Sequence, residues 1–195
     1  MDKFLNKNLN LILGFTVFIA GAAVMIVELI GSRLLAPYVG TSLIPWTALV
    51  GVILGSLSVG YWLGGRLADN KPSLVKFGII ILSSGAAVAL LIWQTFLLSE
   101  LTPILIKYLN LSLTALICAA YLFVIPSILL GIITPYALRL SLDDLVQAGK
   151  TAGSLYAYST LGSIVGTFAA GFIFIPIYGS FKTLSTVVIV LVLLS

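Results

Sequence analysis

The chain has 195 residues, of which 61% are hydrophobic and only 8% are charged, and its mean hydropathy is +1.22. Soluble domains are about 45–50% apolar and about 25% charged, so this composition excludes a soluble globular protein and indicates a polytopic membrane protein. The net charge of +4 is spread over few residues and reports loop composition, which argues against a nucleic-acid-binding face.

Hydropathy predicts an all-α protein with about six transmembrane helices in one membrane domain, residues 1–195. The first span covers residues 9–30, and its apolar run, longer than a signal-peptide core, favours an uncleaved anchor over a signal peptide. The others follow at residues 45–65, 74–98, 111–134, 152–177 and 183–195. The last has about 13 residues where a span needs roughly 17, so we expect either a tilted, shielded helix or a fragment of a longer chain.

The basic residues predict the orientation of these spans. Seven Lys and Arg fall on one side of the membrane and three on the other. The positive-inside rule therefore places both termini in the cytoplasm of a protein of the cell membrane. The seven are Lys3, Lys7, Arg66, Lys71, Lys76, Arg139 and Lys150, and the three are Arg33, Lys107 and Lys182.

Two short similarities predict an internal repeat. Ala-Pro-Tyr at 36–38 matches Thr-Pro-Tyr at 134–136, and Leu-Gly-Ser at 54–56 recurs at 161–163. These matches align the first three spans with the last three. Because three is odd, the two copies would have opposite orientations, as in the inverted three-plus-three repeats of transporter halves.

Several of the 18 glycines recur four residues apart within predicted spans. Such a pair gives a helix a smooth strip where a neighbouring backbone packs closely, or along which helices slide during transport. We expect tight packing of the second and fifth spans. The predicted packing glycines are Gly51, Gly55, Gly60, Gly64, Gly162 and Gly166.

Glu28 lies well inside the first span, where an ionised side chain costs on the order of 2.5–3.5 kcal/mol near mid-membrane and needs a partner. One prediction is a structural ion pair with Arg33 at the outer interface. The alternative is a cation or polyamine site, to which Tyr38 and Trp46 add cation–π attraction. Histidine is absent and the only cysteine, Cys118, lies in an apolar run, so no catalytic, metal or cofactor site is predicted.

Charged residues also gather at the predicted cytoplasmic boundary. Gly65, Arg66 and Asp69 end the second span, and Arg139 follows the fourth. Such groups lock neighbouring helix ends together, and we predict a charge cluster there. The Gly65 to Asp69 spacing resembles the loop motif between the second and third helices of the major facilitator superfamily, although Asn70 stands where that motif has a basic residue. The adjacent acids Asp143 and Asp144 are predicted to be a solvated loop surface.

Four longer blocks occur in order along the chain: residues 28–42 (ELIGSRLLAPYVGTS), 60–69 (GYWLGGRLAD), 131–140 (GIITPYALRL) and 148–167 (AGKTAGSLYAYSTLGSIVGT). Together they resemble the membrane region of transporter-like spermidine synthases. In that family the membrane helices precede a cytosolic domain that transfers aminopropyl from decarboxylated S-adenosylmethionine to putrescine. The nucleotide loop and catalytic aspartates of that domain have no counterpart here, so the resemblance implies the membrane half alone.

The leading functional hypothesis is therefore a non-catalytic membrane module that anchors a synthase domain or subunit in the lipid bilayer. In this hypothesis the module also binds or passes a polyamine. A second hypothesis is a small polyamine or organic-cation transporter that works as a homodimer, because six helices are half of a major-facilitator-like unit. A third is a structural assembly subunit of a membrane complex, which needs no ligand site.

Overall fold

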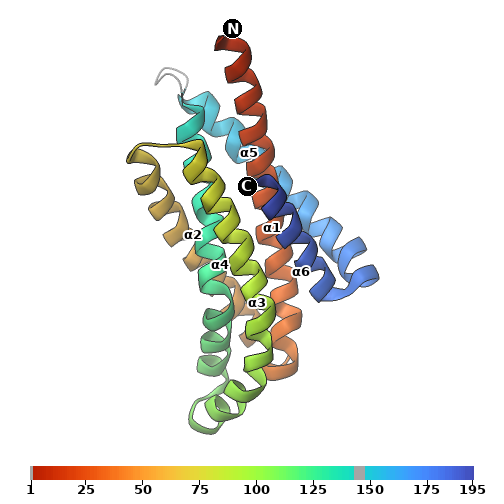
Figure 1. Ribbon diagram of the computed structural model, residues 1–195. Coiled ribbons are helices and arrows are strands. Elements are labelled where there is room, and N and C mark those ends of the chain that lie inside the picture. Colours follow the sequence, from red (N-terminus) through yellow and green to blue (C-terminus); the bar gives the residue numbers. More distant parts are fainter. Residues whose placement is uncertain (1, 143–147) are drawn as a thin grey trace.

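The computed structural model describes residues 2–142 and 148–195, with side chains described from residue 9 onward (Figure 1). The described chain is helical apart from short turns, which confirms the predicted all-α class. Six α-helices follow one another, and the π-helix η2 (Ala170–Phe174) joins the last two. They are α1 (Asp2–Val39), α2 (Leu43–Asp69), α3 (Leu74–Tyr108), α4 (Leu111–Ser141), α5 (Ala148–Ala169) and α6 (Ile175–Leu194).

Within the described residues, five helical stretches are long and apolar enough to cross a membrane. They are Leu9–Val39, Leu43–Asp69, Leu74–Tyr108, Leu111–Ser141 and the combined stretch Ala148–Leu194. Large apolar side chains such as Leu54, Trp93 and Phe172 are exposed on the outside of the bundle. Exposing so large an apolar surface to water is unfavourable in free energy. The chain is therefore a multi-pass membrane protein whose outer surface suits lipid.

The expected fifth and sixth spans lie in that last combined stretch, so the prediction of six separate spans is not confirmed. The chain bends back at Gly179, whose φ of 78° and ψ of 169° are not helical, and Figure 1 shows α5 and α6 as the two arms of a V. The arm after Gly179 is about 22 Å long, against roughly 30 Å for the hydrocarbon core. It runs antiparallel to α3, since Phe181 stacks on Phe96 and a Cβ on Gly78 would meet the carbonyl oxygen of Ser195.

Three helices are longer than predicted because they continue through proline. α1 passes Pro37, α3 passes Pro103 and α4 passes Pro135. They end at Val39, Tyr108 and Ser141, where the predictions ended at residues 30, 98 and 134. Proline removes one intrahelical hydrogen bond, yet membrane helices tolerate it because neighbouring groups satisfy the freed carbonyl.

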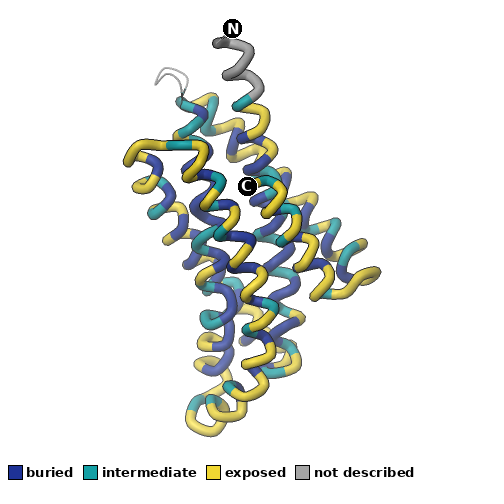
Figure 2. The backbone as a smooth tube through the Cα atoms, in the orientation of Figure 1, coloured by how far each residue is buried: buried dark blue, intermediate teal, exposed yellow. Residues whose placement is uncertain are grey.

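The helix α4 is the centre of the bundle (Figure 2). It contacts α1, α2, α3 and α5, and its side chains Leu122, Phe123, Ile133 and Tyr136 are almost completely buried. Its contact with α3 is antiparallel, because Thr102 meets Cys118 and Phe77 meets Tyr136.

Parallel packing of α1 and α5 depends on glycine. A Cβ on Gly162 would overlap the backbone of Phe18, and one on Gly166 would lie 2.6 Å from the Cα of Ala22. The hydroxyl of Ser163 donates a hydrogen bond of 3.2 Å to the carbonyl oxygen of Gly21 across the same contact. The two predicted glycines of α5 therefore do pack closely against a neighbouring backbone.

Parallel packing of α2 and α4 depends on glycine in the same way. A Cβ on Gly60 would overlap the backbone of Ile128, and one on Gly64 would lie 2.8 Å from the carbonyl oxygen of Ile132. In contrast, a Cβ on Gly51 or Gly55 would meet nothing within 4 Å. The prediction that these two glycines pack is wrong within the described chain, because they lie on the outer face of α2, away from α4.

Candidate functional site

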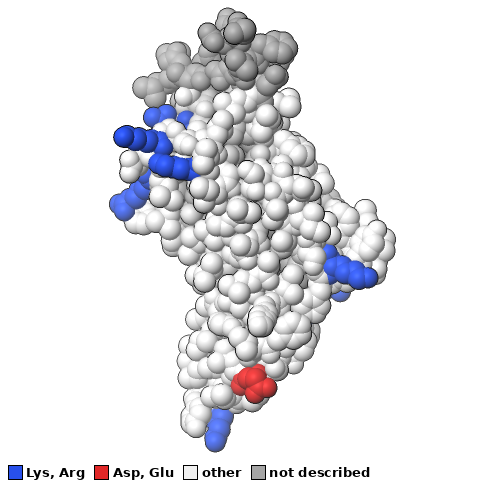
Figure 3. Space-filling view, in the orientation of Figure 1, with Lys and Arg blue, Asp and Glu red and all other residues white. Residues whose placement is uncertain are grey.

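On the face drawn in Figure 3, Lys and Arg side chains gather at the upper left, at the right-hand protrusion and at the bottom. We define the basic end as the end at which α2 and α4 finish and α3 and α5 begin. Its cations are Arg66, Lys71, Lys76, Arg139 and Lys150, and all five belong to the group that the loops predicted for one side. Arg33 and Lys107 lie near the ends of α1 and α3, at the opposite end, whereas Lys182 follows the bend at Gly179.

At the basic end the predicted charge cluster is partly assembled. Arg139 Nε lies 3.8 Å from Asp69 Oδ1, which joins the ends of α4 and α2. Arg66 instead places its guanidinium carbon 3.8 Å from the ring centroid of Trp62 on its own helix. A Cβ on Gly65 would meet nothing within 4 Å, so this glycine does not bring the helix ends closer.

Tyr136 holds the turn between α2 and α3. Its hydroxyl oxygen accepts a hydrogen bond of 3.1 Å from the backbone nitrogen of Ser73, and the hydroxyl lies 3.4 Å from the carbonyl oxygen of the same residue, to which it donates. Its ring stacks on Phe77 with centroids 5.8 Å apart. Only 1% of this tyrosine is exposed, so α4 fixes the first turn of α3 from inside the bundle.

The same turn is closed by Lys76. Its ammonium donates hydrogen bonds of 3.1 Å to the carbonyl oxygens of Asn70 and Lys71. Lys71 has a φ of 54°, a left-handed conformation that costs energy in a residue with a side chain. Sequence reasoning missed the contacts of Tyr136 and Lys76. The position of Tyr136 near the end of an apolar helix could have predicted its contact, because a buried tyrosine hydroxyl needs a hydrogen-bond partner.

At the opposite end, Arg33 and Trp46 line a cleft of about 280 Å³ at the turn between α1 and α2. We call it the α1–α2 cleft. Its other lining residues are Ser32, Leu35, Ala36, Gly40, Thr41, Ser42 and Pro45. Tyr38 turns away from it and donates a hydrogen bond of 3.3 Å to the carbonyl oxygen of Thr95 on α3. Two of the four predicted ligand residues, Arg33 and Trp46, are therefore brought together.

Glu28 lies elsewhere on α1, and the predicted ion pair with Arg33 is not formed. In the described part of the chain, the one ion pair within 4.0 Å is that of Asp69 and Arg139. The physical reason is that α1 continues unbroken past Arg33, so the two side chains, five residues apart, point about 140° away from each other. Glu28 is half-buried and does not line the α1–α2 cleft.

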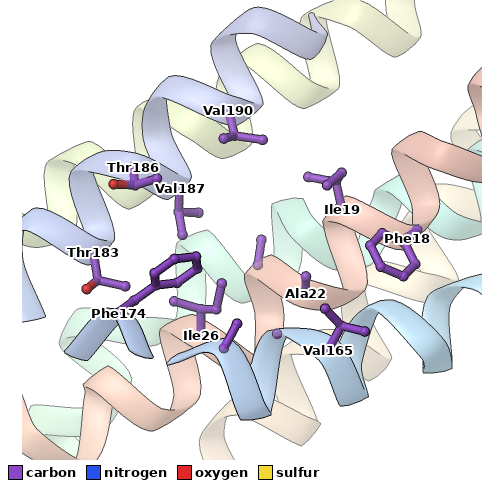
Figure 4. A pocket seen from close by; sticks show the side chains of 13 residues that line it. Phe18, Ile19, Ala22, Ile26, Val165, Phe174, Thr183, Thr186, Val187 and Val190 are labelled. Carbon is purple, nitrogen blue, oxygen red and sulfur yellow. The ribbon is translucent and has the colours of Figure 1, made fainter. Parts of the chain in front are cut away.

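A second cavity of about 260 Å³ lies where α1, α5 and α6 meet (Figure 4). Its walls include Phe18, Ile26, Phe174 and Val187, with Thr183 and Thr186 as the hydroxyl-bearing members. Both hydroxyls donate to carbonyl oxygens of their own helix, Gly179 and Lys182 respectively. This cavity therefore offers a guest mainly van der Waals contact.

Metal binding finds no support in residues 2–142 and 148–195, which contain no group of three or more His, Cys, Asp or Glu able to hold an ion. Asp143 and Asp144, predicted to be a solvated loop surface, lie outside the described residues.

Comparison of the chain with protein-family models, curated proteins and solved structures finds no match. The resemblance to spermidine synthases accordingly stays a prediction from the sequence.

Proposed function

We propose that this protein is a non-catalytic membrane module of a polyamine aminopropyltransferase system, and that it holds a synthase domain or subunit against its basic end. The observation that supports this most is the fixed geometry of that end. Tyr136 with Ser73 ties α4 to the start of α3, and the exposed pair of Asp69 and Arg139 adds a weaker contact between α4 and α2. An anchor for a soluble enzyme benefits from such a rigid platform.

Charge distribution and the placement of α6 agree with this role. The basic end carries the larger share of the described cations, so the positive-inside rule puts it in the cytoplasm, where a synthase acts on soluble substrates. The C-terminal end of α6 also lies near this end, because a Cβ on Gly78, one turn after α3 begins, would meet the carbonyl oxygen of Ser195, the residue after α6. A synthase domain at the basic end would thus lie beside the α2–α3 turn.

The proposal is tested by aminopropyl transfer from decarboxylated S-adenosylmethionine to putrescine. The assay compares the purified chain with the complex captured through it from native membranes in mild detergent. We expect no transfer by the chain alone and transfer by the complex. Transfer by the chain alone contradicts a non-catalytic role, and a captured complex without transfer contradicts the anchoring role.

A second candidate is a small polyamine or organic-cation transporter that works as a homodimer. The observation that favours it is the likeness of the two parallel helix pairs. Gly60 and Gly64 meet α4 as Gly162 and Gly166 meet α1, with the contacts four positions apart on both partners. An inverted repeat that exchanges α1 with α4 and α2 with α5 would produce this likeness. Its register would align Gly60, rather than Gly55, with Gly162.

The transporter candidate assigns the half-buried carboxylate of Glu28 to the cation. Uptake of labelled spermidine into proteoliposomes would then be abolished in Glu28→Gln. The matched control is Glu100→Gln, which neutralises an exposed acid on α3. Equal uptake by both variants excludes Glu28 as the binding group. Absence of uptake by the unmodified chain favours the anchoring module or a structural assembly subunit.

A further inference from the structure

We propose that the α1–α2 cleft binds the phosphate of a phospholipid head group. The cleft lies at the turn between Val39 and Leu43, where one candidate span ends and the next begins. Turns of this kind lie at the membrane interface, which is also the depth of lipid phosphates. The cleft is therefore at the correct level for a head group.

The charge of the cleft selects an anion. Among the residues that line the cleft, Arg33 is the charged one. No described carboxylate lies within 4.0 Å of the Arg33 guanidinium. A guanidinium presents a planar fork of donors that matches two phosphate oxygens, and it is weakly hydrated, so it binds phosphate well at an interface. A polyamine would be repelled, which separates this site from the cation site expected at Glu28.

Neutral donors lie beside the cation. In the described structure the hydroxyls of Thr41 and Ser42 make no hydrogen bond to protein, and Ser42 does not cap α2 with its side chain. Trp46 is 42% exposed in the same cleft, and its indole N–H is a further donor. Tryptophan is typical of the interfacial belt, where its ring lies among head groups and its N–H meets polar atoms.

The surroundings favour a lipid over a free anion. Leu35, Ala36 and Pro45 form apolar walls of the cleft, and Leu43 and Ile44 are exposed immediately beside it. A phospholipid matches both the cation and the apolar surroundings of the cleft. Its phosphate meets Arg33, while its acyl chains cover the exposed side chains of Leu43 and Ile44.

The test is thermal unfolding of the full chain in non-ionic detergent during titration with phosphatidylglycerol. Binding to the native state raises the unfolding temperature by mass action. We expect half-saturation at about tenfold higher lipid concentration in Arg33→Gln, and a smaller change in Arg33→Lys, which keeps the charge but loses the fork. Lys107→Gln, which removes another cation of the same end, is the matched control and should titrate like the unmodified chain.

Two further titrants identify the bound part of the lipid. Diacylglycerol with the same acyl chains lacks the phosphate, and glycerol 3-phosphate lacks the chains. Both should stabilise the chain much less than phosphatidylglycerol. An equal effect of diacylglycerol, an equal effect of glycerol 3-phosphate, or an Arg33→Gln titration identical to that of the unmodified chain would each overturn the proposal. If Arg33→Gln does not fold, the paired variant Thr41→Ala with Ser42→Ala in the exposed turn should also weaken the titration.

Discussion

The hydroxyl of Tyr136 on α4 meets both backbone groups of Ser73, accepting from its nitrogen at 3.1 Å and donating to its oxygen at 3.4 Å. A side chain near the end of the central helix thereby fixes the start of α3, which is 63 residues away in the sequence. The contact joins the end of α4 to the start of α3 at the basic end of the bundle. Removing the single hydroxyl oxygen of Tyr136 therefore tests this contact.

Replacing Tyr136 by Phe removes this hydroxyl and leaves the ring on Phe77. We expect a loss of about 0.5–1.5 kcal/mol in unfolding free energy, the net value of a hydrogen bond. Hydrogen exchange at the amide of Ser73 should become faster, while exchange in the middle of α4 stays unchanged. Unchanged protection of Ser73 would mean that the hydroxyl does not hold the turn.

Gly162 and Gly55 provide a matched pair of glycine substitutions. A Cβ at Gly162 overlaps the backbone of Phe18, so Gly162→Ala should separate α1 from α5 and cost about 1–3 kcal/mol. Gly55 faces open space, so Gly55→Ala should be neutral or stabilise the helix by up to about 1 kcal/mol. Thermal unfolding in detergent gives both values. Equal losses in the two variants would contradict the parallel packing of α1 and α5.

The ion pair of Asp69 with Arg139 should contribute little to stability. The two side chains are 80% and 45% exposed, and exposed pairs contribute about 0–1 kcal/mol, less in high salt. A double-mutant cycle with Asp69→Asn and Arg139→Gln should therefore give a small coupling energy that falls as salt is added. A large, salt-independent coupling would indicate that the pair is buried in a larger assembly.

The orientation of the bundle can be measured with introduced cysteines. A cysteine at Lys71 should react with an impermeant maleimide in inside-out vesicles only, and one at Lys107 in right-side-out cells only, because the basic end is predicted to be cytoplasmic. The natural Cys118 has no exposed surface and should stay unlabelled, which provides an internal control. The reverse pattern would put the basic end outside.

Apolar segments and four of the glycine contacts were predictable from the sequence because hydropathy and residue spacing are local properties. Hydropathy locates the helices that span the membrane, and the four-residue spacing predicted the contacts of Gly60, Gly64, Gly162 and Gly166. The same spacing failed for Gly51 and Gly55, since spacing does not say which face of a helix meets a neighbour.

The remaining differences have physical causes of their own. Asp69 and Arg139 form the predicted contact because α2 and α4 both end at the basic end of the bundle. Glu28 and Arg33 do not, because five residues along the continuous helix α1 turn the two side chains about 140° apart. The bend at Gly179 and the hydrogen bonds of Tyr136 depend on packing between distant segments, which no local pattern reports.

The anchoring role is tested most directly by a photo-crosslinking amino acid placed at Lys71 on the basic end, with Lys107 on the opposite end as the control. We predict that irradiation of native membranes attaches a synthase at position 71 and not at position 107. The isolated crosslinked product should then transfer aminopropyl groups to putrescine. Crosslinking of the synthase at position 107, or a product of position 71 without this activity, would contradict the proposed function.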